Sequence, residues 1–495
     1  MLQVDRAANQ TGGSAPGFDP ARRAVTICLG ALTLVGVWAS PSPLAVLASG
    51  IASIFLVISL WRPGELPVLL LPVYVQFIAV ALKPITTAFT NTPLDDLADF
   101  DANLVPAALF GLAGLAALAF GLRIGAGNAR VLANDATIEG WSFGRILGVT
   151  LIAILIGHAL DLVAERAGGA RQIVLASSGI KWVGLFALAY SALRMRRGLR
   201  WLVLIVAIEL VLGMSGFFSE FRVVLFVLLA AAIAAAQWPW QPGPIITIAV
   251  GAVLALSLAV FWSAVKAPYR DFLNQGTGAQ VVLQPLDERL AFLVDEAIKF
   301  DGRQFALGYE LLLARVSYID FLATTMERVP EALPHEDGAL LGAAVLHVLT
   351  PRILFPDKPE LPSDTLLTAH YTGLENAIRA DANTSISIGY LGELYIDFGV
   401  SGALVAVFLM GLACGRGYRA IRDYPRTPML FNYGLCMMVA LALSSFETSL
   451  IKVVGSFAMV LASALVLQRL MWPALLSSRS VRASNRRSFG GGTEP

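Results

Sequence analysis

Residues 104–122 read LVPAALFGLAGLAALAFGL, nineteen consecutive residues without a charged side chain. An α-helix needs about 20 apolar residues to cross the hydrocarbon core of a bilayer. Lipid cannot satisfy backbone polar groups, so only helices and closed barrels span membranes. A run this rich in Leu and Ala, both strong helix formers, predicts a membrane-spanning helix.

The whole chain shares this character. Of its 495 residues, 57% are hydrophobic and only 14% are charged, and the mean hydropathy is +0.70. Soluble domains are roughly 45–50% apolar and about 25% charged. The composition therefore predicts an all-α polytopic membrane protein whose solvent is the lipid bilayer. The net charge of +1 gives no reason to expect a nucleic-acid partner.

On this length measure we expect about twelve membrane spans. The first and third are short enough to be re-entrant. The twelve expected spans lie near residues 24–39, 43–61, 66–82, 104–122, 146–164, 173–193, 201–218, 222–238, 245–265, 388–417, 428–446 and 450–471. The chain would then consist of a tail (1–23), nine helices (24–265), a large loop (266–385), three helices (386–471) and a basic tail (472–495).

Basic residues indicate the orientation, because cytoplasmic connections are rich in Lys and Arg. With a cytoplasmic N-terminus, every second connection should be basic, and these connections do hold most of the arginines. They include Arg62, Arg123, Arg130, Arg145, Arg194, Arg196, Arg197, Arg200, Arg416, Arg419, Arg422 and Arg426. The large loop has 10 Lys and Arg against 17 Asp and Glu, a net charge of −7. We expect both termini inside and this loop outside.

The large loop is expected to be folded. Apolar residues recur at helical spacing over 283–298 and 309–326, and an apolar, helix-favouring segment over 338–350 is stopped by Pro351. Such amphipathic helices can lie on the outer membrane surface or cover a cavity. Packing of the helices on one another explains the pattern equally well.

Several function classes are excluded by missing motifs. The sequence has no GxxxxGK[ST], no strand-borne GxGxxG, no HExxH and no GxSxG. An ATP-driven pump and a membrane zinc protease are therefore not expected. Cys28, Cys414 and Cys436 all fall in apolar stretches, which argues against a disulfide framework or a metal site. We expect no cofactor.

Four ionisable residues fall inside predicted spans, where a charge is costly and indicates a function by default. They are His158, Asp161, Lys181 and Glu209. Lys181 can pair with Asp161 or Glu209 across neighbouring helices. The cluster is either an ion pair that organises the bundle or the polar floor of an outward-facing cavity.

Two groups of cations are expected on the outer face. The turn between the seventh and eighth spans holds Glu220 and Arg222, and Arg270 follows the ninth span. An arginine and a carboxylate at this depth suit an anionic lipid headgroup. Interfacial snorkelling, in which a long side chain reaches up to the membrane surface, places the same residues there without any function.

The second group lies in PRILFPDKP, residues 351–359, where prolines stiffen the backbone around Arg352 and Lys358. Arginine offers a bidentate fork to phosphate, and lysine adds a point charge. The alternative is a solvated turn with surface ion pairs. Of the loop histidines, His370 is the candidate for a chemical role, although such residues usually lie on the surface.

The most informative stretch is NTSISIGYLGELYIDFG, residues 383–399. In a helix, Tyr390, Glu393 and Asp397 would share one face at the outer end of the tenth span. Two carboxylates and a tyrosine can orient a sugar hydroxyl or accept its proton. Alternatively, the carboxylates favour the helix N-terminus through its dipole, and the glycines serve packing alone.

This stretch resembles a known family. SIGYLGELYIDFG over 387–399, followed by Gly402 and Gly411, resembles the G-E-x-Y-x-x-F-G stretch of bacterial oligosaccharide repeat-unit polymerases, the Wzy-type O-antigen polymerases. Residues 351–359 resemble a matching upstream element, and residues 216–222 a weaker third one. The plan of about twelve helices with one large outer loop agrees along the chain.

The resemblance implies a glycosyltransferase of the bacterial inner membrane. It would polymerise undecaprenyl-pyrophosphate-linked repeat units into a surface polysaccharide or exopolysaccharide on the extracytoplasmic face. Flippase and chain-length regulator proteins would be partners, and no nucleotide would be needed.

We assign the site residues by their own chemistry and position, since the family does not fix the roles. The pyrophosphate must be stabilised by cations, and the attacking hydroxyl needs a base or an orienting group. The expected catalytic residues are Glu393, Arg352, Asp397 and His370. The expected substrate-binding residues are Arg222, Arg270, Lys358, Tyr390 and Glu220.

Two other functions remain open. An O-antigen ligase, which transfers finished glycan to an acceptor, differs little in sequence from a polymerase. A secondary transporter or flippase without catalysis agrees with twelve helices and with the Asp161, Lys181 and Glu209 set. Against transport, the two halves show no internal repeat, and inverted or parallel repeats are common in transporters.

Overall fold

The computed structural model describes the chain except for residues 1–19, 63–64, 129–140, 217–220, 236–241, 278–280, 353, 359–362, 376–385 and 489–495. Every element in the described part is a helix, which confirms the all-α prediction. Within that part, eight helical stretches are long and apolar enough to cross a membrane. They are α1 (Pro20–Ala39), α2 (Pro43–Leu60), α3 (Leu70–Thr90), α4 (Leu104–Ala126), α5 (Phe143–Ala164), α6 with α7, α17 (Tyr390–Arg422) and the stretch Leu450–Leu470 of α19 (Leu450–Ser488).

The other four predicted spans are also helical. α8 (Leu199–Ser215), α9 (Phe221–Ala235) and α18 (Met429–Leu441) have 17, 15 and 13 residues. Each is shorter than the roughly 20 residues that a full crossing needs. α10 (Pro242–Leu273) has 32 residues and continues beyond the predicted span into the large loop.

Two predicted helices are interrupted. The span over 173–193 is divided into α6 (Arg171–Ser178) and α7 (Ile180–Met195), and the Ser178 hydroxyl bonds back to the carbonyl of Leu175 at the break. The loop helix over 309–326 is divided into α12 (Gly302–Val316) and α13 (Ile319–Arg328). There the Tyr318 N–H donates to the Ala79 carbonyl of α3, which takes it out of the helical ladder.

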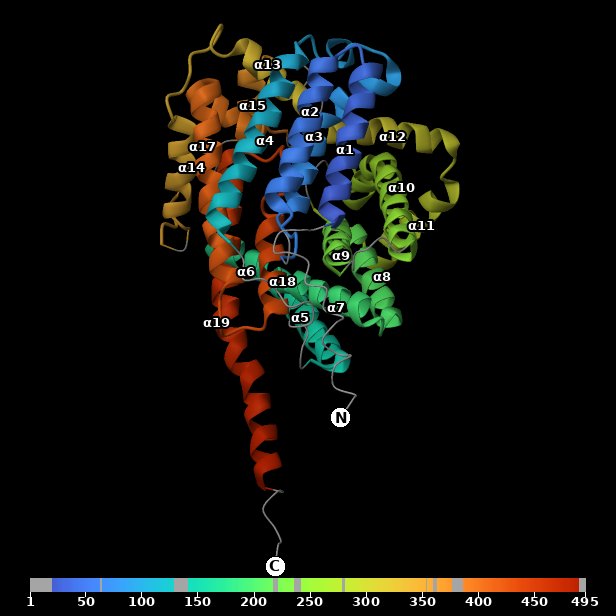
Figure 1. Cartoon of the computed structure of the whole chain (residues 1–495), viewed down its shortest axis with the longest axis vertical. Helices are drawn as coiled ribbons and strands as arrows, with labels where there is room; N and C mark the ends of the chain where they lie inside the picture. Colours follow the sequence, from blue (N-terminus) through green and yellow to red (C-terminus); the bar gives the residue numbers. More distant parts are fainter. Residues whose placement is uncertain are drawn as a thin grey trace, which may run out of the picture.

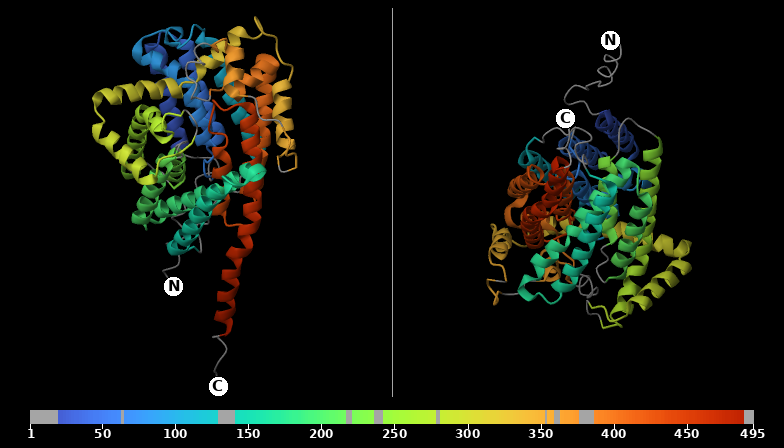
Figure 2. Two further views of the ribbon diagram at one scale, coloured as in Figure 1. Left: turned by 180° about the vertical axis from the view of Figure 1, so that it is seen from behind. Right: turned by 90° about the horizontal axis from the view of Figure 1, so that it is seen from below.

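The described residues between α10 and α17 are mostly helical, and that they form one large outer loop stays a prediction. They also include α11 (Leu286–Lys299), α14 (Ala339–Leu349) and α15 (Asp364–Thr372). Figure 1 shows α1–α4 and α17 running along the long axis, with α14 beside α17 at one side and α10–α12 at the other. Figure 2 shows α5 and α7 crossing obliquely beneath this bundle, and α19 extending out of it.

Helices α4 and α17 cross closely, and glycines make this approach possible. Each helix carries a GxxxG pair, Gly121 with Gly125 and Gly411 with Gly415. A Cβ at Gly121 would lie 2.2 Å from the Phe408 carbonyl oxygen. Small residues at this spacing let backbones approach closely, which drives helix association where no hydrophobic effect operates.

We therefore expect Gly411→Ala to destabilise the protein by about 1–3 kcal/mol, the usual cost of overpacking. The new Cβ would lie 2.4 Å from the Leu118 carbonyl oxygen, and a backbone atom cannot rotate away. Gly30→Ala is the matched control, because nothing lies within 4 Å of its Cβ position. Thermal unfolding in detergent measures both variants, and equal melting temperatures would contradict the close crossing.

Helix α17 breaks at Gly399, whose φ of 64° is accessible mainly to glycine. The break frees the Ile396 carbonyl, which accepts a hydrogen bond from the Glu336 N–H at 3.0 Å. His335 Nδ1 lies 3.1 Å from the same oxygen. The segment before α14 is thereby tied to the outer part of α17.

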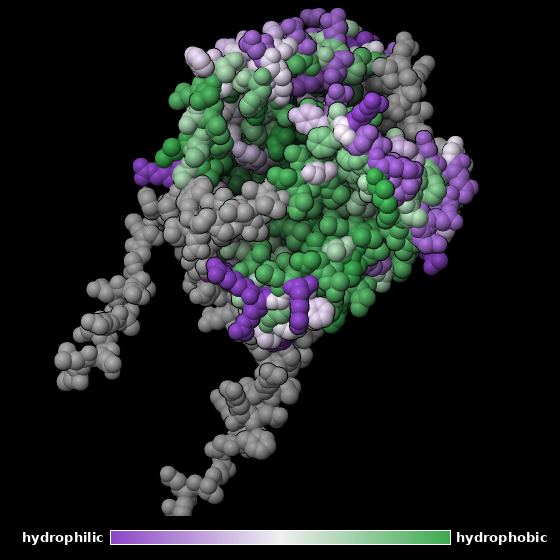
Figure 3. Space-filling view, turned by 90° about the vertical axis from the view of Figure 1, so that its right-hand side faces the viewer, coloured by the Kyte–Doolittle hydropathy of each residue, from purple (hydrophilic) through white to green (hydrophobic). Residues whose placement is uncertain are grey.

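The surface and the connections agree with a membrane protein. Figure 3 shows a hydrophilic upper end, a broad hydrophobic surface below it and a small hydrophilic group beneath. Exposed apolar residues of α8 and α10 include Val203, Leu204, Ile208, Val253, Leu254 and Leu256. The basic connections gather at one end, where Arg62 donates to the Arg123 carbonyl, and Arg422 pairs with Glu65. That this end is cytoplasmic stays a prediction.

Candidate functional site

Glu393 and Asp397 each bind the N-terminus of another helix. Glu393 is buried, and its Oε2 accepts from the Leu450 N–H, the first residue of α19, at 3.0 Å. The two carboxylate oxygens of Asp397 accept from the N–H groups of Leu340 and Leu341, at the start of α14. A helix N-terminus has free N–H groups and a positive dipole end, so these carboxylates cap it.

Tyr390 is also occupied inside the protein. Its hydroxyl donates to the Gln76 Oε1 at 2.7 Å, which joins α17 to α3. The Gln76 amide in turn donates to the Leu443 carbonyl. The predicted shared face of Tyr390, Glu393 and Asp397 is therefore buried, and it organises three neighbouring segments of chain.

The ionisable residues of the spans form one polar cluster. Lys181 Nζ of α7 lies 2.6 Å from Asp161 Oδ2 of α5, one of the two pairings considered from the sequence. His158 Nε2 lies 2.9 Å from Glu209 Oε1 of α8. Lys181 and Glu209 are buried, while His158 and Asp161 are partly exposed. The pairs join α5, α7 and α8.

A double-mutant cycle tests how strongly this pair holds the helices. Interhelical polar contacts in membranes contribute about 0.6 kcal/mol on average and at most about 1.7 kcal/mol. We expect a coupling free energy in that range for Lys181→Met with Asp161→Asn, from unfolding in detergent. Ser177→Ala with Ser463→Ala is the reference cycle for an uncharged contact, because the Ser177 hydroxyl donates to the Ser463 hydroxyl at 3.3 Å. Additive effects of Lys181 and Asp161 would show that the pair contributes nothing.

The segment with Arg352 and Lys358 lies at the far end of α14. α14 starts at Asp397 and is 11 residues long, so its end is about 16 Å away from that carboxylate. Lys358 Nζ donates to the His347 carbonyl. The pKa of Lys358 is lowered mainly by burial and further by the nearby charge of Arg352. His370 is exposed in α15, where its ring contacts Tyr371.

A second group of cations forms where α8, α9 and α10 meet. Phe221 and Tyr269 both pack edge-on against Trp262, with ring centroids 5.5 and 5.7 Å apart. The Tyr269 hydroxyl donates to the Ser215 carbonyl at 3.1 Å, which fixes the end of α8. Arg222 and Arg270 directly follow these two aromatic residues in sequence. The aromatic cluster therefore positions both arginines that the sequence singled out.

Arg315, at the end of α12, joins them. Its side chain is exposed, yet enough protein surrounds it for partial desolvation to lower the guanidinium pKa, and Arg222 lowers it further. Burial also lowers the pKa of Arg270, with Arg315 the second cause. Neither Arg222 nor Arg315 forms a hydrogen bond or ion pair within the described part of the chain. Arg222 and Arg270 therefore each lie close enough to Arg315 for the like charges to interact.

One carboxylate faces this group. Glu447, half-buried in the connection between α18 and α19, is the one acidic side chain that raises the pKa of Arg315 among the described residues. It also raises the pKa of Tyr318, which is shifted upward mainly by burial. The Tyr318 hydroxyl donates to the Ser387 carbonyl and accepts from the Ser387 N–H. Glu447 makes no hydrogen bond or ion pair with any described residue.

We define the arginine site as Arg222, Arg270, Arg315, Glu447 and Tyr318. The sequence identified Arg222 and Arg270, whereas Arg315 and Glu447 were missed. A signal existed for Glu447, because SSFETS (444–449) is a polar interruption between two apolar spans. Of the other predicted residues, Glu393, Asp397, Tyr390, Arg352, Lys358 and His370 lie outside this group. Glu220 lies outside the described residues.

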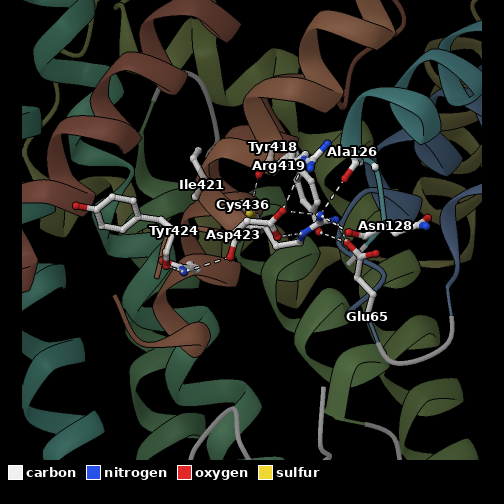
Figure 4. A network of polar contacts seen from close by, with 12 residues as sticks. Glu65, Ala126, Asn128, Tyr418, Arg419, Ile421, Asp423, Tyr424 and Cys436 are labelled. Carbon is white, nitrogen blue, oxygen red and sulfur yellow. Dashed lines mark hydrogen bonds and ion pairs between the residues drawn. The ribbon is translucent and has the colours of Figure 1, made fainter. Parts of the chain in front are cut away.

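At the other end of the bundle, a buried ionic network surrounds Arg422. Its Nη1 lies 2.7 Å from Glu65 Oε1, its Nη2 donates to the Ala126 carbonyl, and its Nε pairs with Asp423. Figure 4 shows Glu65, Tyr418 and Asp423 in this network. It joins the α2–α3 connection, the end of α4 and the end of α17.

Comparison with known proteins adds a family. A family model described as "Domain of unknown function (DUF8712)" matches residues 116–416. This chain belongs to that family. No curated protein and no solved structure matches it. The DUF8712 match contains the three arginines of the arginine site, while Glu447, Arg422 and Glu65 fall outside it.

Proposed function

We propose that the protein is a membrane glycosyltransferase that polymerises polyprenyl-pyrophosphate-linked oligosaccharide units at the arginine site. The observation that supports this most is that Arg222 and Arg270 each lie near Arg315, with Glu447 as the one acidic side chain that faces Arg315 among the described residues. Like charges repel, and neither Arg222 nor Arg315 forms an ion pair within the described part of the chain, so an anion that binds beside them is stabilised. A pyrophosphate supplies several negative oxygens for arginine forks.

The chemistry suits these groups. The bond between the sugar anomeric carbon and the pyrophosphate oxygen breaks, and a bond to the acceptor hydroxyl oxygen forms. Negative charge develops on the leaving pyrophosphate, where the arginines stabilise it. The hydroxyl proton passes to a base, and Glu447 is the described carboxylate that faces Arg315. The polyprenyl pyrophosphate leaves, and one glycan has been extended.

Glu393, the catalytic residue expected from the sequence, remains the competing choice for the base. Its Oε2 already caps α19. Glu447→Gln and Glu393→Gln separate the two choices, since each keeps the shape of the side chain. We expect Glu447→Gln to abolish chain extension and Glu393→Gln to retain it. Loss of extension in Glu393→Gln alone would return the role to that residue.

Deletion of the gene tests the function itself. A polymerase predicts single repeat units in place of long chains among lipid-linked and surface glycans. A ligase predicts long chains that stay on the polyprenyl carrier. A transporter, favoured by the ionisable cluster around Lys181 and Glu209, predicts intermediates trapped on the cytoplasmic face. An unchanged glycan profile would contradict all three functions.

A further inference from the structure

An apolar groove lies between α17 and α19. Its volume is about 760 Å³, within the range of ligand pockets. Val405, Leu409 and Met410 line it from α17, and Val454 and Phe457 line it from α19. Ser401 is the one hydroxyl-bearing residue among the lining side chains. A groove of this composition offers hydrocarbon surface and almost no hydrogen-bond partners, so it suits a hydrocarbon chain.

The groove opens onto the exposed apolar surface of the protein. Val405 and Leu409, which line it, are 59% and 53% exposed. On the neighbouring α14, Leu346 and Leu349 are 62% and 69% exposed. These residues lie on stretches apolar enough for lipid contact. A lipid of the surrounding bilayer can therefore enter the groove sideways, without passing through the protein.

Two cations lie beside the groove without an ion pair to any described residue. α14 packs along it, with Leu341 in the lining and Val348 against Gly455, which lies between the lining residues Val454 and Phe457. Arg352 and Lys358 lie just beyond that end of α14, where Lys358 donates to the His347 carbonyl. Neither cation forms an ion pair within the described ranges. Two cations held together beside hydrocarbon-facing surface are costly unless an anion joins them.

We propose that this groove binds an anionic phospholipid of the bilayer, with its phosphate at Arg352 and Lys358 and an acyl chain between α17 and α19. Basic pockets between membrane helices bind anionic headgroups in this way. The inference is independent of the proposed glycosyl transfer. Figure 1 shows α14 and α10–α12 at opposite sides of the molecule, so this lipid site is separate from the arginine site.

Native mass spectrometry of the full-length protein tests the lipid site. Phosphatidylglycerol, phosphatidylcholine and undecaprenyl phosphate are each titrated into the detergent-solubilised protein. We expect phosphatidylglycerol to bind best. In Arg352→Ala/Lys358→Ala its affinity should fall by about tenfold or more, because charge-assisted hydrogen bonds contribute about 1.5–3 kcal/mol each. Phosphatidylcholine binding should change much less.

Two further variants complete the test. Arg197→Ala/Arg416→Ala removes two exposed cations elsewhere and should leave phosphatidylglycerol binding unchanged. Ala406→Trp/Ala458→Trp fills the groove and should weaken binding while both cations remain. Unchanged phosphatidylglycerol affinity in Arg352→Ala/Lys358→Ala overturns the site. Tighter binding of undecaprenyl phosphate than of phosphatidylglycerol overturns the choice of occupant.

Discussion

Replacing Arg315 by alanine is expected to lower the rate of glycan extension by about 10²–10³-fold, the usual effect of removing one preorganised donor from a developing negative charge. Arg315 is the member that electrostatically links Arg222, Arg270 and Glu447. Without the Arg315 guanidinium, the departing pyrophosphate would lack the cation that links the other two. Extension of a lipid-linked acceptor by membranes containing equal amounts of protein measures the effect.

Arg303→Ala is the matched control for this prediction. Arg303 lies in the first turn of the same helix α12, is exposed and has only its backbone N–H bound, by Asp301. It should keep wild-type extension. Arg315→Lys should recover part of the rate, because the charge remains but the bidentate fork is lost. Wild-type extension by Arg315→Ala would remove the arginine site from the mechanism.

The second large effect is on stability. Arg422→Ala is expected to lower the free energy of unfolding by about 3–5 kcal/mol, the cost of leaving a buried partner charge uncompensated. The side chains of Arg422 and Glu65 are 3% and 7% exposed. Glu65 Oε2 already lacks a hydrogen bond within the described part of the chain, and Arg62 lies 3.5 Å from it. Thermal or denaturant unfolding in detergent measures the loss.

Two variants show whether the buried charge causes this loss. Arg419→Ala removes an arginine three residues earlier, whose side chain is 58% exposed and 3.5 Å from Asp423. Exposed pairs contribute at most about 1 kcal/mol, so this change should be small. Arg422→Ala/Glu65→Gln should recover stability relative to Arg422→Ala, because the buried carboxylate is then replaced by a neutral amide. Equal losses for Arg419→Ala and Arg422→Ala would contradict the network.

Much of the fold follows from local sequence. Apolar length located most of the helices, since lipid demands that each crossing satisfy its own backbone, and eight helical stretches in the described part are long and apolar enough to cross a membrane. The short lengths of α9 and α18 could not be predicted from the sequence. A helix that is covered by other parts of the protein does not have to span the whole hydrocarbon core. The break after α12 was also unpredictable, since the Tyr318 N–H finds its acceptor in α3, over 200 residues away.

The candidate site was harder to predict for a physical reason. Acidic residues at a helix start draw attention, yet Glu393 and Asp397 have partners in α19 and α14 that no local pattern reveals. The sequence allowed either a role in orienting a substrate hydroxyl or a structural role at a helix N-terminus. The observed contacts favour the structural role, because both carboxylates cap other helices. Arg315 and Glu447 come from distant segments that only the tertiary fold brings near Arg222. Contacts between residues far apart in the sequence produce no periodic pattern from which they could be predicted.

The most direct test of the proposed function uses the purified protein and one defined substrate, a polyprenyl-pyrophosphate-linked repeat unit. Mass spectrometry follows the products in detergent or in vesicles, with no nucleotide and no other enzyme present. The proposed function predicts glycans of two or more units, with one polyprenyl pyrophosphate released for each bond formed, and neither product with Arg315→Ala. Recovery of the unchanged single unit, with the protein folded, would contradict it.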